Sequence, residues 1–403
     1  MSRRVVVTGM GVFSPLGTDL ETFADGLFNG QCAIKPQTYA YDDDLSLTLP
    51  AAAIEGADET LAALGRDMTR ADPYSQFGVA AAEMAIAHSG ITFDDALRTR
   101  TATLLGTGIG GQQSSDDTHY NMLRKGRRPH PLTILRTIPN ALSSHISIRH
   151  GLTGPSFAIA SACASGAHAI GMAADMIRNG HADAAITGAS EKGLTYGALE
   201  AWRAMHILSS DICRPFSKTR NGLVIGEGAA VLVLEEYENA RARGANIHAE
   251  LTGFGLNADG NDMINPSTEG AAGSMRLALR DITIADPAQV YINAHGTGTL
   301  LNDPTETAAI RAVFGSDADD LIVSSTKSMH GHLLGAAGGL EAVAAICALK
   351  AGQIPPTINL DEPDPACDLD YAASGTVTRP INLALSNSFA FGGQNAVLAF
   401  EPV

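Results

Sequence analysis

The chain lacks an excess of basic residues and any regular arrangement of cysteines. Against 43 acidic residues it has 27 Lys and Arg, so its formal net charge is -16. This balance argues against a general nucleic-acid-binding protein, which would need a basic surface. The five cysteines are scattered over the 403 residues, with no CxxC spacing. We therefore expect reduced, mostly buried thiols rather than a disulfide framework.

Long apolar runs are also missing. No stretch reaches the roughly 18 uninterrupted apolar residues of a membrane helix. The apolar run after the first arginines is shorter than a signal sequence and is followed by glycines, so it predicts a first β-strand. We expect a cytoplasmic protein with no membrane segment. Apolar residues make up 45% of the chain and charged residues 17%, which excludes disorder as the main state.

Apolar runs typical of strands alternate with helical patterns of small residues. Strands are expected at 4–8 (ending at Gly9 and Gly11), 101–105, 157–162, 231–234 and 290–293, and helices at 75–88 and 164–178. The 42 glycines indicate tight turns and close backbone approaches. The length predicts two or three structural units.

The pattern begins again in the second half of the chain. VVVTGMGV is matched by AELTGFGL, LLGTGIGG by NAHGTGT, and IASACASGAHAIGMAA by VSSTKSMHGHLLGAAGG. This order predicts duplication of one α/β unit, with halves at 1–248 and 249–403, and a layered α/β architecture with two related sheets. Segments 41–70 and 112–139 are irregular in pattern and are expected to be insertions in the first half.

Three residues could carry chemistry. Cys163 is placed between a predicted strand and helix, where the helix dipole would stabilise a thiolate, although an inert buried cysteine fits the same pattern. His295 and His332 lie in glycine-rich loops after strands, where open α/β folds hold ligands. Lys327 could raise the local positive potential, keep a nearby histidine neutral, or simply lie on the surface. One cysteine and two histidines without a clear carboxylate partner suit carbon–carbon chemistry through a thioester.

Two cofactor patterns are incomplete. His330 and His332, together with Asp303 and Glu306, could suggest a metal site, but the HGH loop lacks the helical spacing of common zinc sites. The Gly9-x-Gly11 turn lacks the third glycine of a dinucleotide fingerprint. We expect neither a metal nor a bound cofactor.

Seven segments, in order along nearly the whole chain, resemble the β-ketoacyl-acyl-carrier-protein synthases. They are RRVVVTGMGVFSPLG, GPSFAIASACASGAHAI, CRPFSKTRNGLVIGEGAAVLVLE, INAHGTGTLLNDPTE, SSTKSMHGHLLGAAGGLEA, PPTINLDEPDPACDLDY and SNSFAFGGQNAVLAF. The resemblance is to the elongating, Cys-His-His branch of the thiolase superfamily, since the initiating branch has asparagine where His332 stands. It implies a duplicated thiolase-like fold in five α-β-α-β-α layers. It also implies decarboxylative condensation of malonyl-carrier protein with a cysteine-bound acyl chain in fatty acid synthesis.

The resemblance assigns roles to individual residues. Cys163 would accept the acyl chain, and His295 and His332 would support decarboxylation and stabilise the enolate. Lys327 would pair with Glu306. Phe391 would act as a gate, and its backbone N–H would form an oxyanion hole with that of Cys163. Thr297 and Thr299 would form hydrogen bonds with the carrier's phosphopantetheine arm.

The resemblance further implies an acyl tunnel and a partner surface. Ile109 and Trp202 fall at tunnel positions, and Leu132 and Thr133 would come from the other subunit of a dimer. The acyl carrier protein would dock on the basic cluster formed by Arg124, Lys125, Arg127 and Arg128, with Arg70 and Arg203 as further candidates. His206 stands where relatives often have arginine.

Two functions remain open within this resemblance, and two others fit the sequence less well. An active elongating synthase, expected as a homodimer, is the first. A specialised ketosynthase for a polyketide, polyene or nodulation-factor chain is the second, possibly in a heterodimer with a chain-length partner. An inactive partner subunit would usually lack the nucleophile, and a thiolase would carry a second cysteine near the C-terminus.

Overall fold

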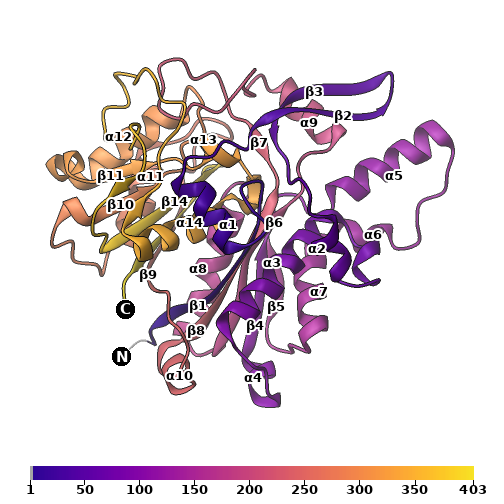
Figure 1. Cartoon of the computed structure of the whole chain (residues 1–403), viewed down its shortest axis with the longest axis horizontal. Helices are drawn as coiled ribbons and strands as arrows, with labels where there is room; N and C mark the ends of the chain where they lie inside the picture. The colour runs from indigo at the N-terminus through magenta and orange to yellow at the C-terminus, as the bar shows by residue number, and fades with distance from the viewer. Residues whose placement is uncertain (1–2) are drawn as a thin grey trace.

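A computed structural model describes residues 3–403, and its centre is a ten-stranded mixed β-sheet (Figure 1). The first five strands in sheet order are β5 (Ser156–Ile159), β4 (Thr101–Gly106), β6 (Ala184–Glu191), β8 (Gly228–Glu236) and β1 (Val5–Phe13). The other five, from the opposite edge, are β11 (Ile322–Ser324), β10 (Val290–Asn293), β14 (Leu383–Ala390), β15 (Gln394–Glu401) and β9 (Ala249–Ala258). The two sets meet at β1 and β9 through only two residue pairs.

Strand order is the same in both sets. When the five sheet strands of each half are numbered 1 to 5 along the chain, their order in the sheet is 3-2-4-5-1 from the outer edge to the centre, in both halves. We propose that residues 1–248 and 249–403 are the two copies of one duplicated unit, and this shared order supports the division. The two related half-sheets are hydrogen-bonded to each other at β1 and β9 rather than separate.

Helices form the other layers. The outer face of the first half-sheet is covered by α3 (Pro73–Ser89), which also packs on α7 (Ala141–His150), and that of the second by α11 (Thr268–Ala278), which packs on α12 (Asn302–Phe314). Between the half-sheets lie α8 (Ser165–Arg178) and α14 (Ala337–Ala351), each in contact with strands of both halves. The predicted five-layer α-β-α-β-α architecture is confirmed.

The central helices approach each other at glycines. A Cβ atom added to Gly166 of α8 would lie 2.6 Å from the backbone nitrogen of Gly339 in α14, and one added to Gly338 would lie 2.7 Å from that of Ala167. Such distances leave no room for a side chain, so the two helix backbones are in direct contact. Segment 334–351, which includes α14, is apolar and long enough to cross a membrane by composition, but 89% of it is buried inside the protein.

The glycines of the repeated Thr-Gly-x-Gly motif allow helices to pack on the sheet, whereas the sequence pattern suggested that they end a strand. We predicted that the first strand ends at Gly9, whereas β1 continues to Phe13. Added Cβ atoms at Gly9 and Gly11 would lie 2.2 and 2.0 Å from carbonyl oxygens of α3. At Gly253 and Gly255 of β9 the corresponding distances to α11 are 2.0 and 1.9 Å. In both halves the glycines lie within a strand and let a helix pack directly on its backbone.

The remaining elements are short or peripheral. The strands are β2 (Lys35–Asp42), β3 (Leu45–Ala52), β7 (Ile225–Gly226), β12 (Gln353–Ile354) and β13 (Val377–Thr378). The helices are α1 (Leu20–Phe28), α2 (Asp58–Ala63), α4 (Asp95–Arg100), α5 (Gln112–Lys125), α6 (Thr133–Thr137), α9 (Tyr196–Ala204), α10 (Tyr237–Ala242) and α13 (Lys327–His330). Short 3-10 turns cover Met68–Arg70, Pro287–Gln289, Gly315–Asp319 and Leu334–Ala336.

The two segments expected to be irregular contain regular structure. Segment 41–70 includes β3 and α2, and segment 112–139 includes α5 and α6. The α5 helix and the β2–β3 hairpin extend together from the body (Figure 1). Tyr41 of the hairpin stacks on Tyr120 of α5 with ring centroids 4.3 Å apart. This long-range contact stabilises α5 and is not encoded in its local pattern.

Candidate functional site

Cys163 lies in a constrained turn between β5 and α8. The preceding Ala162 has a φ of +48°, a left-handed conformation that is uncommon for a residue with a side chain. Ser165 fixes the turn, because its hydroxyl donates to the Ala162 carbonyl at 2.7 Å and accepts from the Ser161 N–H at 2.9 Å. The sulfur is therefore held at a defined position at the start of the central helix.

The Cys163 thiol is buried, and burial decides its protonation state. Desolvation raises the pKa of Cys163 to about 12, and the nearby Lys327 charge opposes this only in part. The stabilisation of a thiolate expected from the helix end is therefore outweighed by the loss of hydration. The site holds a neutral thiol.

His332 contacts this thiol directly. Its Nε2 atom lies 3.1 Å from Cys163 Sγ. The other ring nitrogen, Nδ1, accepts a hydrogen bond from the backbone N–H of Leu334 at 3.3 Å. Burial, with the Lys327 charge second, holds the pKa of His332 well below its usual value. The ring is thus neutral with its proton on Nε2, which donates toward the sulfur.

His295 has the same arrangement. Its ring centroid lies 5.3 Å from that of His332, with the ring planes 86° apart. Its Nδ1 atom lies 3.5 Å from the ammonium of Lys327. Burial, then Lys327 and His332, lower the pKa of His295 well below its usual value. Because a donor faces Nδ1, the proton of His295 is also on Nε2.

The predicted ion pair between Lys327 and Glu306 is wrong. Lys327 pairs with Glu341 of α14, and both side chains are fully buried. Glu306 instead accepts hydrogen bonds from the backbone N–H groups of His295 and Gly296, each at 2.8 Å, and from the Asn387 amide at 3.0 Å. Glu306 therefore fixes the backbone that carries His295, while Glu341 holds Lys327 behind the imidazoles.

A cavity of about 270 Å³ opens onto these groups. Cys163, His295 and His332 line it, as do Thr297, Thr299, Trp202 and Phe391 among the predicted residues. The hydroxyls of the two threonines lie 3.0 Å apart. The rings of Trp202 and Phe391 stack with centroids 6.1 Å apart and planes 27° apart. The structure thus brings together most of the residues singled out from the sequence.

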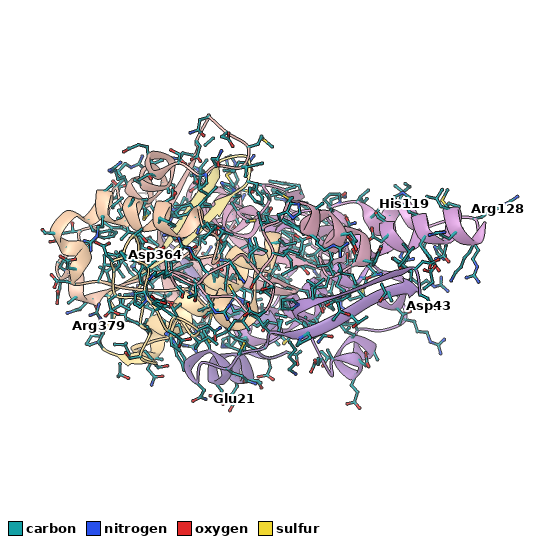
Figure 2. All side chains as sticks on the ribbon, turned by 90° about the horizontal axis from the view of Figure 1, so that it is seen from above. Glu21, Asp43, His119, Arg128, Asp364 and Arg379 are labelled. Atoms are coloured by element: carbon teal, nitrogen blue, oxygen red, sulfur yellow. The ribbon has the colours of Figure 1, made fainter. Side chains whose placement is uncertain are left out.

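Other predicted residues lie apart from the cavity. Ile109 is not among the described residues that line the cavity. Its backbone N–H donates to the carboxylate of Glu191 at 3.3 Å. The basic cluster lies at the C-terminal end of α5 and just after it, and Figure 2 shows Arg128 at the far end of the molecule. Asp43 of the β2–β3 hairpin lies at the same end, and the charge of Arg124 contributes to lowering the pKa of Asp42.

Sequence reasoning missed two buried glutamates. Glu191 accepts hydrogen bonds from the backbone N–H of Gly108 and from that of Gly335 at 3.0 Å, so it ties a loop of the first half to one of the second. Glu341 is the only charged residue of the small-residue run LGAAGGLEA, and this charge in an otherwise apolar run was an available signal. Glu191 is the last residue of the apolar strand β6, and nothing in its local sequence indicated this role.

Family models match most of the chain. The N-terminal domain of β-ketoacyl synthases matches residues 2–240, and the C-terminal domain of that family matches residues 248–361. The chain belongs to the β-ketoacyl synthase family. It is therefore an acyl-transferring condensing enzyme with a thiolase-like fold, and the predicted family and enzyme class are confirmed.

Relatives and solved structures of similar length fall into both predicted functional groups. The chain is 43% identical to nodulation protein E of Rhizobium leguminosarum bv. trifolii, over 100% of both chains. It is 39% identical to 3-oxoacyl-[acyl-carrier-protein] synthase 2 of Synechocystis sp., over 99% of this chain and 98% of the relative. The ishigamide ketosynthase/chain length factor structure has a TM-score of 0.92 at 35% identity, over 100% of both chains.

A second solved structure concerns a partner. It is a type II polyketide acyl-carrier protein in complex with its ketosynthase, with a TM-score of 0.90 at 31% identity over 100% of both chains. The main prediction of a 3-oxoacyl-acyl-carrier-protein synthase and the alternative of a specialised type II ketosynthase both agree with these relatives.

Proposed function

We propose that the enzyme extends a Cys163-bound acyl chain by two carbons, using malonyl-acyl-carrier protein. The observation that carries this proposal is the contact of one neutral thiol with one of two neutral imidazoles in a single cavity. In the first step, Sγ of Cys163 attacks the acyl thioester of the carrier. The acyl group moves to Sγ, and the thiol proton ends on the carrier's departing sulfur.

In the second step, a malonyl thioester enters the cavity and loses carbon dioxide. The electron pair of the broken bond forms an enolate, whose oxygen would be stabilised by Nε2–H of His295 and Nε2–H of His332. The enolate carbon attacks the acyl carbon on Cys163. The carbon–sulfur bond breaks, and Sγ takes up a proton, which restores the thiol. The N–H groups of Cys163 and Phe391 are proposed to hold the carbonyl oxygen during both attacks.

Lys327 is proposed to keep both imidazoles neutral. A protonated imidazole would donate to the enolate as well, but it would also bind the malonyl carboxylate and oppose its loss as neutral carbon dioxide. Thr297 and Thr299 are proposed to hold the phosphopantetheine arm, which the carrier supplies, so no cofactor belongs to the enzyme itself.

The length and type of the acyl chain are the second question. Identity of 43% to a nodulation protein E and likeness to polyketide ketosynthases favour a specialised chain as the alternative to saturated fatty acids. Trp202 supports this alternative, since its large ring lines the cavity beside Phe391. Mass spectrometry of products from saturated, unsaturated and polyketo primers on carrier protein would decide between them.

A partner subunit is proposed at the β5 edge. β5 is an edge strand of the described sheet, and Phe157 on it is exposed, as are Leu123, Ile134 and Ile148 of the neighbouring helices α5, α6 and α7. Unpaired strand edges and apolar patches of this kind are covered in stable assemblies. We propose a second copy there, with a chain-length partner as the alternative, and a cytoplasmic location for the assembly.

Substitution of the nucleophile tests the reaction. Cys163→Ser should abolish stable acylation of the protein by an acyl-carrier donor, as measured by intact mass. His332→Ala should still become acylated but should release little carbon dioxide from malonyl-carrier protein. Full product formation by Cys163→Ser would contradict the proposal.

A further inference from the structure

A second cavity, of about 680 Å³, lies apart from the catalytic one. It is formed by β1 and the helices α1, α3 and α14. Among the described residues, none lines both cavities. Small-molecule sites usually have volumes of roughly 300–1,000 Å³. The second cavity is therefore large enough for a ligand that does not occupy the catalytic site.

Most of the walls of this second cavity are apolar. Strand β1 contributes Met10 and helix α3 contributes Met84, while α1 contributes Leu20, Ala24 and Phe28. A hydrocarbon chain that lies along these side chains leaves water, which is favourable. The walls therefore favour a ligand with a long apolar part.

Basic groups gather where α3 and α14 end. Lys350, in the last turn of α14, and His88, in the last turn of α3, both line the cavity and are exposed. The ring of His88 lies against that of the buried His248, with centroids 4.4 Å apart. The Nζ atom of Lys350 lies 2.5 Å from Nδ1 of His248. One ammonium and two imidazoles thus form a single cluster at one end of the cavity.

This cluster has donors without an acid to receive them. Burial, with the Lys350 charge second, lowers the pKa of His248 to about 4, and burial also lowers the pKa of His88. Because the Lys350 ammonium faces Nδ1 of His248, the proton of that ring is on Nε2, and this buried atom has no hydrogen-bond partner among the described residues. The ion pairs within residues 3–403 do not include Lys350. An anion is the partner that this end of the cavity lacks.

Two acidic residues limit the charge of that anion. Asp19 and Glu21 also line the cavity. The Asp19 carboxylate caps α1, where it accepts from the N–H and the hydroxyl of Thr22 at 2.8 and 2.9 Å. Glu21 is exposed at the start of α1 (Figure 2). A single ammonium in a cavity that also holds two carboxylates favours a singly charged head group over a phosphate dianion.

We propose that this cavity binds a free fatty acid of medium chain length. Its carboxylate pairs with the ammonium of Lys350 beside His88, at the exposed end of the cavity. Its chain lies along the apolar side chains of β1, α1 and α3. This site is additional to the catalytic one and does not depend on the proposed function.

Decanoate is the probe, and calorimetric titration of the full chain at about pH 7, where the carboxylate is ionised, counts its binding sites. Lys350→Met should weaken binding at one site by roughly tenfold or more, because the charged partner of the carboxylate is removed. Lys125→Met is the matched control, since Lys125 is also exposed in the last turn of a helix, and it should change the affinity less than about twofold. Butyrate should bind this site at least about tenfold more weakly than decanoate, because it covers less of the apolar walls.

Alkylation by N-ethylmaleimide locates the probe without any variant. Cys347 lines the second cavity and Cys163 lines the catalytic one, so mass spectrometry of their separate peptides reports on each. Saturating decanoate should slow the labelling of Cys347 by about threefold or more in wild type. The same concentration should leave the labelling of Cys347 in Lys350→Met unchanged.

Three outcomes would overturn the inference. Equal affinity of wild type and Lys350→Met at every site, or protection of Cys163 alone, would place decanoate in the catalytic cavity. Equal affinity for butyrate and decanoate would show that the apolar walls hold no chain. Tighter binding of decyl phosphate than of decanoate, with protection of Cys347, would contradict the singly charged head group.

Discussion

Replacing Glu306 by glutamine isolates the role of the carboxylate beneath His295. The two backbone donors use different oxygens, since the His295 N–H is bonded to Oε1 and the Gly296 N–H to Oε2. A glutamine side chain offers one oxygen and one NH2 group. One of the two buried N–H groups must then face a donor, whichever way the amide is turned.

The cost follows from that mismatch. A buried donor left without an acceptor costs about 1–3 kcal/mol. Replacing a buried carboxylate with a neutral amide offsets part of this loss of stability, because burial raises the pKa of Glu306 and so disfavours its charged form. We expect Glu306→Gln to lower the free energy of unfolding by about 2 kcal/mol. The kcat should fall more than KM changes, because the His295 backbone is displaced while the cavity mouth is intact.

Urea denaturation followed by circular dichroism, together with steady-state kinetics, would measure both effects. Glu269→Gln is the control, since Glu269 is 84% exposed at its side chain on α11. If Glu306→Gln unfolds within about 0.5 kcal/mol of wild type, the reasoning from two separate acceptor oxygens is refuted.

Two further predictions concern the imidazoles and the cavity wall. Wild-type activity should show no loss from imidazole protonation down to about pH 6, since both histidines titrate well below their usual pKa. Lys327→Met combined with Glu341→Leu removes a charge that lowers the pKa of both imidazoles, so they should protonate more easily and the acid limb of the kcat profile should move to higher pH. An unmoved limb would contradict the role of Lys327. Trp202→Ala should shift products to longer chains by mass spectrometry, and an unchanged length distribution would place the acyl chain elsewhere.

The residues proposed to be catalytic could be located in the sequence because each lies in a local pattern of its own. Cys163 and the two histidines follow strands and precede glycine-rich or small-residue turns, so sequence alone located them. Partners could not be predicted in the same way. The sequence offers both Glu306 and Glu341 as possible ion partners of Lys327. Only three-dimensional packing shows that the partner is Glu341 of α14. The neutral state of Cys163 likewise depends on burial by distant segments.

The fold shows the same division. The internal repeat predicted a duplicated α/β unit, and the resemblance to the condensing enzymes implied the five layers. The regular structure of segment 112–139 was not predicted, because α5 depends on the stacking of Tyr120 against Tyr41 from far away in the chain. The end of the first strand was misplaced at Gly9. Glycine there was interpreted as a turn, but its lack of a side chain serves the approach of α3.

The contact of α8 with α14 has a consequence for how the reaction tolerates change. Cys163 belongs to the first half of the chain and both imidazoles to the second, while the half-sheets share only two residue pairs. The spacing of sulfur and nitrogen is thus set by how closely these two helices touch at Gly166 and Gly338, and by the backbone hydrogen bonds that His332 forms with Val224 and Gly226 of the first half. An alanine in place of Gly166 or Gly338 would add one methyl group at this crossing and push the two halves apart. Activity would then be lost although no reacting atom had been altered.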